Sequence, residues 1–223
     1  MCIIMIKQAG AKAPTEEMLK NMYDRNPDGA GYMFNGKDQM VHIRKGFMNF
    51  EKFKNSFEQD LKKNPNSTFV THCRIGTQGG NTAEMTHPYP LIADYKQMKL
   101  TNARVDIGVA HNGIINLTSN HLVFDHNDTM EFIKDYLNPL VRFGNLRNEK
   151  RIRQLAERLI GSYNKIVILY GDGDMTILNK QLFIEDKETG LLFSNTTYKQ
   201  PKYVYDSYDG KKPWKNWWPG ITD

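Results

Sequence analysis

The first ten residues of the chain read MCIIMIKQAG (residues 1–10). From Cys2 to Ile6 the run is short, apolar and rich in β-branched side chains, which is typical of a buried strand. A strand that begins at the second residue would place the Cys2 thiol beside the start of the chain. The segment lacks a basic n-region, and its apolar stretch is too short for a secretory signal. We therefore expect a protein of the reducing cytoplasm that is built around a terminal strand.

The composition indicates a folded chain with a real core. Of its 223 residues, 39% are hydrophobic and 11% are aromatic. Its 30 Lys and Arg residues exceed its 25 Asp and Glu residues by a net charge of +5, and the two signs are interspersed, which argues against a nucleic-acid partner. No apolar run approaches the roughly 20 residues of a membrane span. The 2 cysteines are too few for a disulfide-built scaffold.

Outward from the first strand, apolar spacing and turn residues predict runs of strands with helices between them. Helices are expected near residues 16–22, 50–61, 128–141 and 147–160. Further strands are expected near residues 32–34, 41–43, 67–72, 105–111, 165–170, 175–178, 182–184 and 191–193. Because strands outnumber helices and arrive in runs, we predict the α+β class. Residues 1–200 form the predicted domain, and residues 201–223 form a Lys-, Trp- and Tyr-rich tail. We expect this tail to pack onto the domain edge; the alternative is that its aromatic residues stack on single-stranded nucleic acid or dock on a partner.

Cys2 becomes a candidate nucleophile if Met1 is removed. Methionine aminopeptidase removes an initiator methionine when the next side chain is small, and cysteine qualifies. The freed α-amine has a pKa near about 7.7–8.0, so part of it is a free base at neutral pH. Such an amine can take the thiol proton without help from a histidine. The alternative is that Cys2 is a small apolar residue in a terminal strand.

Three other polar features stand at the ends of predicted elements. Arg74 lies where a strand runs into a glycine-rich turn, and its planar fork suits a carboxylate, with the Thr77 hydroxyl as an added donor. The pair Asn112–Gly113 follows a strand, and an Asn amide with a Gly N–H can bind an oxyanion. Asp128 opens a helix, where its default role is that of a cap. Each feature taken singly also fits an ordinary strand end, turn or cap.

Together these pieces resemble the class II glutamine amidotransferases. These N-terminal nucleophile hydrolases serve as the glutaminase domains of glucosamine-6-phosphate synthase, asparagine synthetase and glutamate synthase. The resemblance lies in the order and spacing of Cys2, NPDGAG (residues 26–31), HCRIGTQG (72–79), HNG (111–113) and NDT (127–129), which span most of residues 1–130. The chain departs from the family at Ile3, where glycine is common, and at Gln78, where histidine is frequent.

The resemblance implies a four-layer αββα sandwich of the N-terminal nucleophile hydrolase type. It also implies that Cys2 attacks the side-chain amide of glutamine. Asn112 and Gly113 would then hold the oxyanion, so these three residues form the implied catalytic group.

The resemblance further implies how the substrate is bound. Arg74, assisted by Thr77, would hold the α-carboxylate of glutamine, and Asp128 would hold its α-ammonium group. A role beside the nucleophile or in positioning glutamine is implied for Asp28, Gly29 and Gln78. A zwitterionic amino acid needs one anion-binding fork and one carboxylate, which this set supplies.

The sequence thus predicts a cytoplasmic glutaminase-type amide hydrolase that acts on glutamine without a cofactor or a metal ion. Because too little chain follows residue 130 to form an acceptor domain, either the ammonia would pass to a separate synthetase subunit or the protein would be a simple amidase. Two alternatives remain open. One is a catalytically inactive scaffold or partner-binding module, motivated by Ile3 and Gln78. The other is an N-terminal nucleophile hydrolase that acts on a different amide.

Overall fold

The computed structural model describes residues 2–76, 80–116, 125–143 and 146–199. Two antiparallel sheets dominate this part of the chain. The seven-stranded sheet has the order β10-β11-β1-β4-β2-β3-β6, and the four-stranded sheet has the order β5-β7-β8-β9. The predicted α+β class is confirmed. The tail at residues 201–223 lies outside the described residues.

The strands of the seven-stranded sheet are β1 (Ile3–Lys7), β2 (Ala30–Asn35), β3 (Val41–Phe47), β4 (Phe69–Cys73), β6 (Asn102–Val105), β10 (Ile184–Glu185) and β11 (Leu192–Phe193). Those of the four-stranded sheet are β5 (Tyr89–Pro90), β7 (Ile107–Asn112), β8 (Lys165–Tyr170) and β9 (Met175–Leu178). The α-helices are α1 (Glu16–Asp24), α2 (Phe50–Lys63), α3 (Tyr95–Met98), α4 (Asp128–Phe132), α5 (Asn138–Phe143) and α6 (Lys150–Ile160).

The terminal strand β1 is interior to its sheet. It pairs with β4 on one side and with β11 on the other. All five of its residues are buried, which explains why the run is continuously apolar up to Ile6 instead of alternating.

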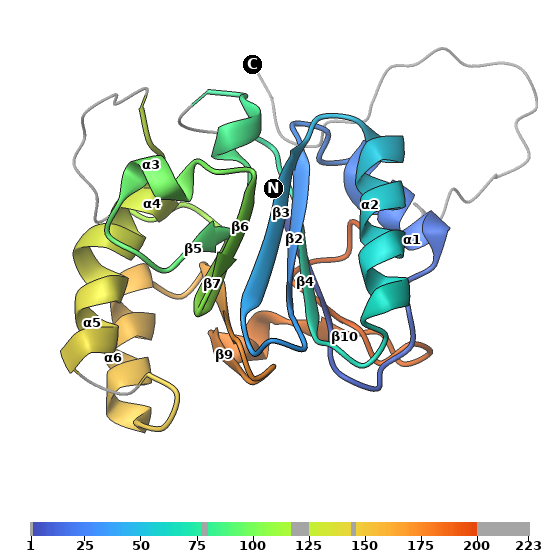
Figure 1. Ribbon diagram of the computed structural model, residues 1–223. Helices are drawn as coiled ribbons and strands as arrows, with labels where there is room; N and C mark the ends of the chain where they lie inside the picture. The colour runs from blue at the N-terminus through green and yellow to red at the C-terminus, as the bar shows by residue number, and fades with distance from the viewer. Residues whose placement is uncertain (1, 77–79, 117–124, 144–145, 200–223) are drawn as a thin grey trace, which may run out of the picture.

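Helices α1 and α2 cover the outer face of the seven-stranded sheet (Figure 1). Thr15 caps α1 by accepting the N–H of Met18, and Asn49 caps α2 by accepting the N–H of Lys52. One hydrophobic cluster joins the two helices to the sheet and includes Phe53, Phe57, Phe69, Tyr32 and Leu19.

A second hydrophobic cluster lies between the two sheets, and a third lies under α4, α5 and α6. The second joins side chains of β1–β4 to side chains of β7 and β8, among them Ile4, Val70 and Val167. The third packs the opposite face of the four-stranded sheet against α4–α6, which lie far from α1 and α2 in Figure 1. Each sheet is therefore buried on both faces.

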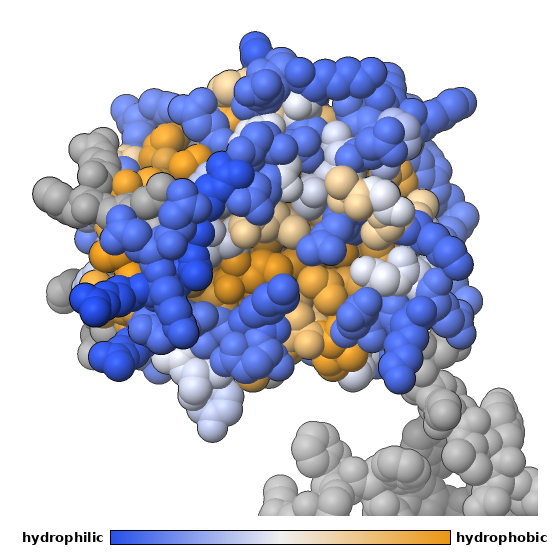
Figure 2. Space-filling view, turned by 90° about the horizontal axis from the view of Figure 1, so that it is seen from below, coloured by the Kyte–Doolittle hydropathy of each residue, from blue (hydrophilic) through white to orange (hydrophobic). Residues whose placement is uncertain are grey.

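The cluster between the sheets reaches the surface near the edge strands β9 and β10. Ile177 and Phe183 are only half-buried there, although they pack against this cluster. Figure 2 views the molecule from the side on which β9 and β10 lie in Figure 1, and it shows apolar residues gathered at the centre of that face with polar residues around them. Among the described residues, no helix is long and apolar enough to span a bilayer.

Several element boundaries differ from those predicted. The strand expected at residues 105–111 is two strands, because β6 ends at Val105 and β7 begins at Ile107 in the other sheet. The helix expected at residues 128–141 contains a π-helical turn over Ile133–Leu137. Residues 180–182 form a 3₁₀ turn where a strand was expected from residue 182. Strand β5 and helix α3 were not predicted, since two- and four-residue elements carry almost no periodicity.

Candidate functional site

Cys2 directly precedes β1. This end of β1 lies near the C-terminal end of β7, which belongs to the second sheet. The antiparallel register sets Ile3 opposite Cys73, which places Cys2 beside the chain that leaves β4. There the N–H of Ile75 donates to Cys2 Sγ at 3.3 Å, and Sγ lies 3.4 Å from the Ile75 carbonyl oxygen. Asn195 Nδ2 donates to the Cys2 carbonyl oxygen at 2.7 Å. The thiol is thus fixed by backbone groups and by a residue far along the chain.

The environment of Cys2 favours the neutral thiol. Burial raises the pKa of the Cys2 thiol, while the Ile75 N–H and the positive charge of Arg74 act in the opposite direction. A nucleophile of this kind needs a base to take its proton at neutral pH. An α-amine on the same residue would meet that need.

Arg74, Asp28 and Gly29 lie together at the same end of the seven-stranded sheet. The N–H of Arg74 donates to the Gly29 carbonyl at 2.8 Å, and the N–H of Asp28 donates to the Arg74 carbonyl at 3.0 Å. Asp28 Oδ2 also accepts the N–H of Gly76 at 2.8 Å, so this carboxylate holds the turn after Arg74. The Arg74 side chain is only 4% exposed and donates to Asn81 Oδ1 at 3.2 Å.

Asn112 and Gly113 lie where β7 ends, in the other sheet. Asn112 is 1% exposed, and its Nδ2 donates to Ser194 Oγ at 2.7 Å. Gly113 has φ +148°, and a Cβ built there would lie 2.0 Å from Asn164 Oδ1. Asn164 cannot readily move aside, because its Oδ1 bonds His111 Nε2 at 2.8 Å and its Nδ2 donates to the Ile114 and Ile160 carbonyls. Only glycine fits this turn without strain.

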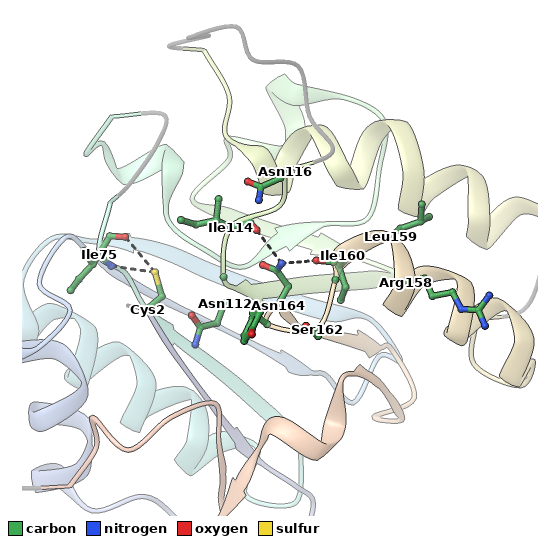
Figure 3. A pocket seen from close by; sticks show the side chains of 13 residues that line it. Cys2, Ile75, Asn112, Ile114, Asn116, Arg158, Leu159, Ile160, Ser162 and Asn164 are labelled. Carbon is green, nitrogen blue, oxygen red and sulfur yellow. Dashed lines mark hydrogen bonds between the residues drawn. The ribbon is translucent and has the colours of Figure 1, made fainter.

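One cavity of about 710 Å³ brings the implied nucleophile and the implied oxyanion residues together (Figure 3). Cys2, Asn112 and Gly113 all line it, although they come from two different sheets. Apolar walls are supplied by Ile75, Ile114, Leu159 and Ile160, and further lining comes from Asn116, Arg158, Gly161, Ser162, Tyr163 and Asn164. The cavity therefore runs from the Cys2 thiol toward the C-terminal end of α6.

The implied substrate-binding residues are placed differently. The described residues that line the cavity do not include Arg74, Asp28, Gly29 or Asp128. Asp128 Oδ2 accepts the N–H of Ile115 at 2.8 Å, and its Oδ1 accepts the N–H of Thr129 at 2.8 Å. The carboxylate thus ties the segment after the Asn112–Gly113 turn to the start of α4. Thr77 and Gln78 lie outside the described residues.

The cap of α4 differs from the default role given to Asp128. Asn127 is the N-cap, since its side chain accepts the N–H of Met130 at 3.0 Å. Asp128 is the first residue of the helix. This position leaves its carboxylate near the helix N-terminus, where a negative charge is favourable.

Three buried histidines lie behind the site, between the sheets and α4. Burial lowers the pKa of His72 to about 3 and lowers the pKa of both His87 and His111, so all three rings are neutral. Thr129 Oγ1 bonds His87 Nε2 at 3.1 Å and His111 Nδ1 at 2.7 Å. Both ring nitrogens of His72 have no hydrogen-bond partner within the described ranges. The described residues contain no cluster of His, Cys, Asp and Glu that fits a metal ion.

Sequence reasoning missed three residues that hold the site together: Asn164, Ser194 and Asn195. Asn164 fixes the turn at Gly113, Ser194 bonds Asn112, and Asn195 bonds the Cys2 carbonyl. The signal available in the sequence was the polar pair Ser194–Asn195 directly after an apolar strand. That signal is weak, because Ser and Asn are common wherever a strand ends in a turn.

Comparison with known proteins leaves the family of this chain open. No model of a known protein family matches the sequence, and no curated protein is significantly similar to it.

Proposed function

We propose that this chain is a glutaminase-type amide hydrolase, similar to the class II glutamine amidotransferases, that uses Cys2 as an N-terminal nucleophile. The observation that carries the proposal is the shared cavity: the Cys2 thiol, Asn112 and Gly113 line the same space although 110 positions separate them in the sequence. A thiol facing an Asn-Gly pair is the minimal arrangement for attack on an amide with oxyanion binding. The proposal includes the four-layer αββα arrangement of the N-terminal nucleophile hydrolases, and the hydrophobic clusters on both faces of each sheet support it.

The first half of the reaction forms a thioester. Removal of Met1 frees the α-amine of Cys2, which takes the thiol proton as Sγ attacks the side-chain carbonyl carbon of glutamine. The carbonyl oxygen becomes an oxyanion, bound by the Asn112 side chain and the Gly113 N–H. When the tetrahedral intermediate collapses, the carbon–nitrogen bond breaks and the ammonium group of Cys2 gives its proton to the departing amide nitrogen, which leaves as ammonia.

The second half releases glutamate. Water attacks the γ-glutamyl thioester while the α-amine of Cys2 accepts a proton from it. The oxyanion forms again at the same place, and its collapse breaks the carbon–sulfur bond. The thiolate recovers the proton from the ammonium group, which regenerates the starting enzyme.

Recognition of the amino-acid end of glutamine is assigned to Arg74, assisted by Thr77 and Gln78, and to Asp128. Arg74 is held rigidly at the sheet end next to Cys2, and Asp28 and Gly29 fix the turn beside it. A rigid guanidinium binds a carboxylate with little loss of side-chain entropy. The ammonia product is proposed to serve a separate synthetase subunit in the cytoplasm.

The decisive experiment is covalent labelling with a glutamine-mimicking diazoketone. The reagent should add one adduct, located on Cys2 by mass spectrometry of the peptides. Glutamine should protect against it, and Cys2→Ala should abolish it, whereas Cys73→Ala should leave it intact because the Cys73 side chain is fully buried. Intact mass of the same sample should show that Met1 is absent.

A second candidate function is favoured by the apolar walls of the cavity. Ile75, Ile114, Leu159 and Ile160 would suit an amide that carries an apolar group better than the polar end of glutamine. If Cys2 is labelled but glutamine gives no protection, hydrolysis of such an amide becomes the better assignment. If Met1 is retained and no adduct forms, the chain is a scaffold or partner-binding module that keeps this fold.

A further inference from the structure

The hydroxyl of Ser194 connects the strand that carries Cys2 to the residue assigned to the oxyanion. Ser194 Oγ accepts the N–H of Ile4 at 2.8 Å and also accepts Nδ2 of Asn112 at 2.7 Å. Two N–H donors therefore point at one oxygen, and the Ser194 proton is left to find an acceptor elsewhere. At the same time, Asn112 Oδ1 is buried and has no hydrogen-bond partner in the part of the chain that is described.

Rotating the Asn112 carboxamide by half a turn resolves both problems at once. The carboxamide oxygen then faces Ser194 and accepts its O–H, while Ser194 Oγ still accepts the N–H of Ile4. The nitrogen takes the position that Oδ1 now occupies, which Figure 3 shows on the side of Cys2. Oxygen and nitrogen of a carboxamide have almost the same shape, so the rotation changes hydrogen bonding and leaves packing unaltered.

We propose that Ser194 is a positioning residue that holds Asn112 in this rotated orientation, with its NH₂ group directed at the oxyanion. The inference rests on the proposed function, since it names the residue that prepares its oxyanion site. In the rotated state an Nδ2 hydrogen of Asn112 forms a strong hydrogen bond only when negative charge develops on the oxygen of the attacked carbonyl. Such a donor stabilises the transition state more than the bound substrate.

The backbone around Ser194 holds its hydroxyl in place beside Asn112. The N–H of Ser194 donates to the Ile4 carbonyl at 2.9 Å, so Ser194 is clamped to β1 through both its backbone and its side chain. Ser194 is 2% exposed, which keeps water from competing for its hydroxyl. A chain from the Ile4 N–H through Ser194 to the Asn112 carbonyl polarises each bond in the same direction and strengthens the Nδ2 donors.

Two reagents that differ in their need for an oxyanion site test the proposal. Acylation of Cys2 by p-nitrophenyl acetate forms a carbon–sulfur bond, passes through an oxyanion and releases nitrophenolate. Alkylation by iodoacetamide displaces iodide and forms no oxyanion. Ser194→Ala should lower the acylation rate constant by about 10-fold or more, while the alkylation rate constant changes by less than about 2-fold. Asn112→Asp, which lacks the NH₂ group, should lower acylation by about 100-fold.

Matched variants separate positioning from loss of structure. Ser194→Thr retains the hydroxyl and should restore most of the acylation rate, and Ser194→Ala in an Asn112→Asp background should cause no further loss. Thr176→Val removes another buried hydroxyl, bonded to Tyr170, and should change neither rate. If Ser194→Ala unfolds, Ser194→Cys provides a second variant of similar size with a weak donor.

The outcomes distinguish this inference from the function on which it rests. Loss of acylation in Ser194→Ala together with an absence of glutamine hydrolysis in the wild type would retain the role of Ser194 and reject glutamine as substrate. If Ser194→Ala lowered the acylation and alkylation rate constants equally, Ser194 would only support the structure around Cys2, and the inference would be overturned. An unaffected acylation rate in Asn112→Asp would overturn it as well, because Asn112 would then supply no donor.

Discussion

At the scale of single residues, the protonation of Cys2 decides how the site can react. Burial raises the pKa of this thiol, so near neutral pH the sulfur carries its proton. In protein that retains Met1, we expect the iodoacetamide rate to keep rising as the pH increases past 9, because the thiolate forms only there.

In processed protein the rate should instead rise between about pH 7 and 8.5, since the adjacent α-amine becomes a free base in that range. Stopped alkylation reactions analysed by mass spectrometry at a series of pH values provide the measurement. Identical profiles for the two forms would remove the α-amine from the role of base.

Arg74 provides the second prediction at this scale. Arg74→Ala should raise KM for glutamine by about 10- to 100-fold, as expected for the loss of a charge-assisted bond to a carboxylate, with a smaller effect on kcat. Steady-state kinetics of ammonia release measure both constants. Because Arg74 is almost fully buried, a thermal unfolding curve should accompany them. A large fall in Tm with KM unchanged would show that Arg74 supports the fold only.

At the scale of elements, the turn after β7 is the most constrained part of the site. Gly113→Ala places a methyl group against Asn164 in a backbone conformation with positive φ. We expect it to cost about 1–3 kcal/mol of unfolding free energy from overpacking, in addition to about 1 kcal/mol from the backbone, and to abolish activity.

Gly190→Ala is the matched control for this turn. Gly190 has φ +72° and nothing within 4 Å of the added Cβ, so only the backbone cost should remain. Urea unfolding of the two variants gives the difference. Equal destabilisation would mean that Asn164 yields to the new methyl group.

Strand β4 contains an unusual hydroxyl. Thr71 is fully buried, and its Oγ1 has no hydrogen-bond partner among the residues that the structure describes. Thr71→Val replaces this hydroxyl with a methyl group of similar size, so the unfolding free energy should rise by about 1 kcal/mol. Thr68→Val, just before the same strand, removes a hydroxyl that donates to the Gly173 carbonyl, and should lower it by about 1 kcal/mol. Urea unfolding measures both changes, and a change of the unfolding free energy in the same direction for the two variants would contradict this prediction.

At the scale of the whole molecule, the buried histidines make stability depend on acid. Burial holds the pKa of His72 at about 3 and lowers the pKa of His87 and His111, against an ordinary value of 6.5. Below pH 6.5 the unfolded chain therefore binds protons that the folded chain does not. Stability should be complete above this pH and fall as the pH decreases below it. Each histidine contributes about 1.4 kcal/mol per pH unit until its own lowered pKa is reached, which for His72 is about 3.

Urea unfolding between pH 7 and pH 4.5 measures this dependence. His72→Gln should reduce the slope by about one proton, because it removes a ring that is protonated only in the unfolded chain over this pH range. A wild-type slope near zero would show that the three rings become protonated without unfolding.

Much of the fold follows from local patterns in the sequence. Helices α1, α2 and α6 and strands β8 and β9 depend on neighbours within a few residues, and they lie close to the ranges that the sequence predicts. The division of residues 102–112 between two sheets was not predictable in this way. The chain changes sheets at Asp106, because β6 pairs with β3 in one sheet and β7 pairs with β8 in the other.

By itself the sequence determined the α+β class, the buried terminal strand and the chemical types of Cys2, Arg74, Asn112 and Asp128, because propensity, apolar spacing and side-chain chemistry are local properties. Only the tertiary structure decided that Cys2 and Asn112 share one cavity, that the Asp128 carboxylate bonds Ile115, and that Ser194 bridges the two sheets. These relations join residues through strand register and sheet stacking. Such long-range contacts leave no periodic trace in the sequence, so they become visible only when the sheets are assembled.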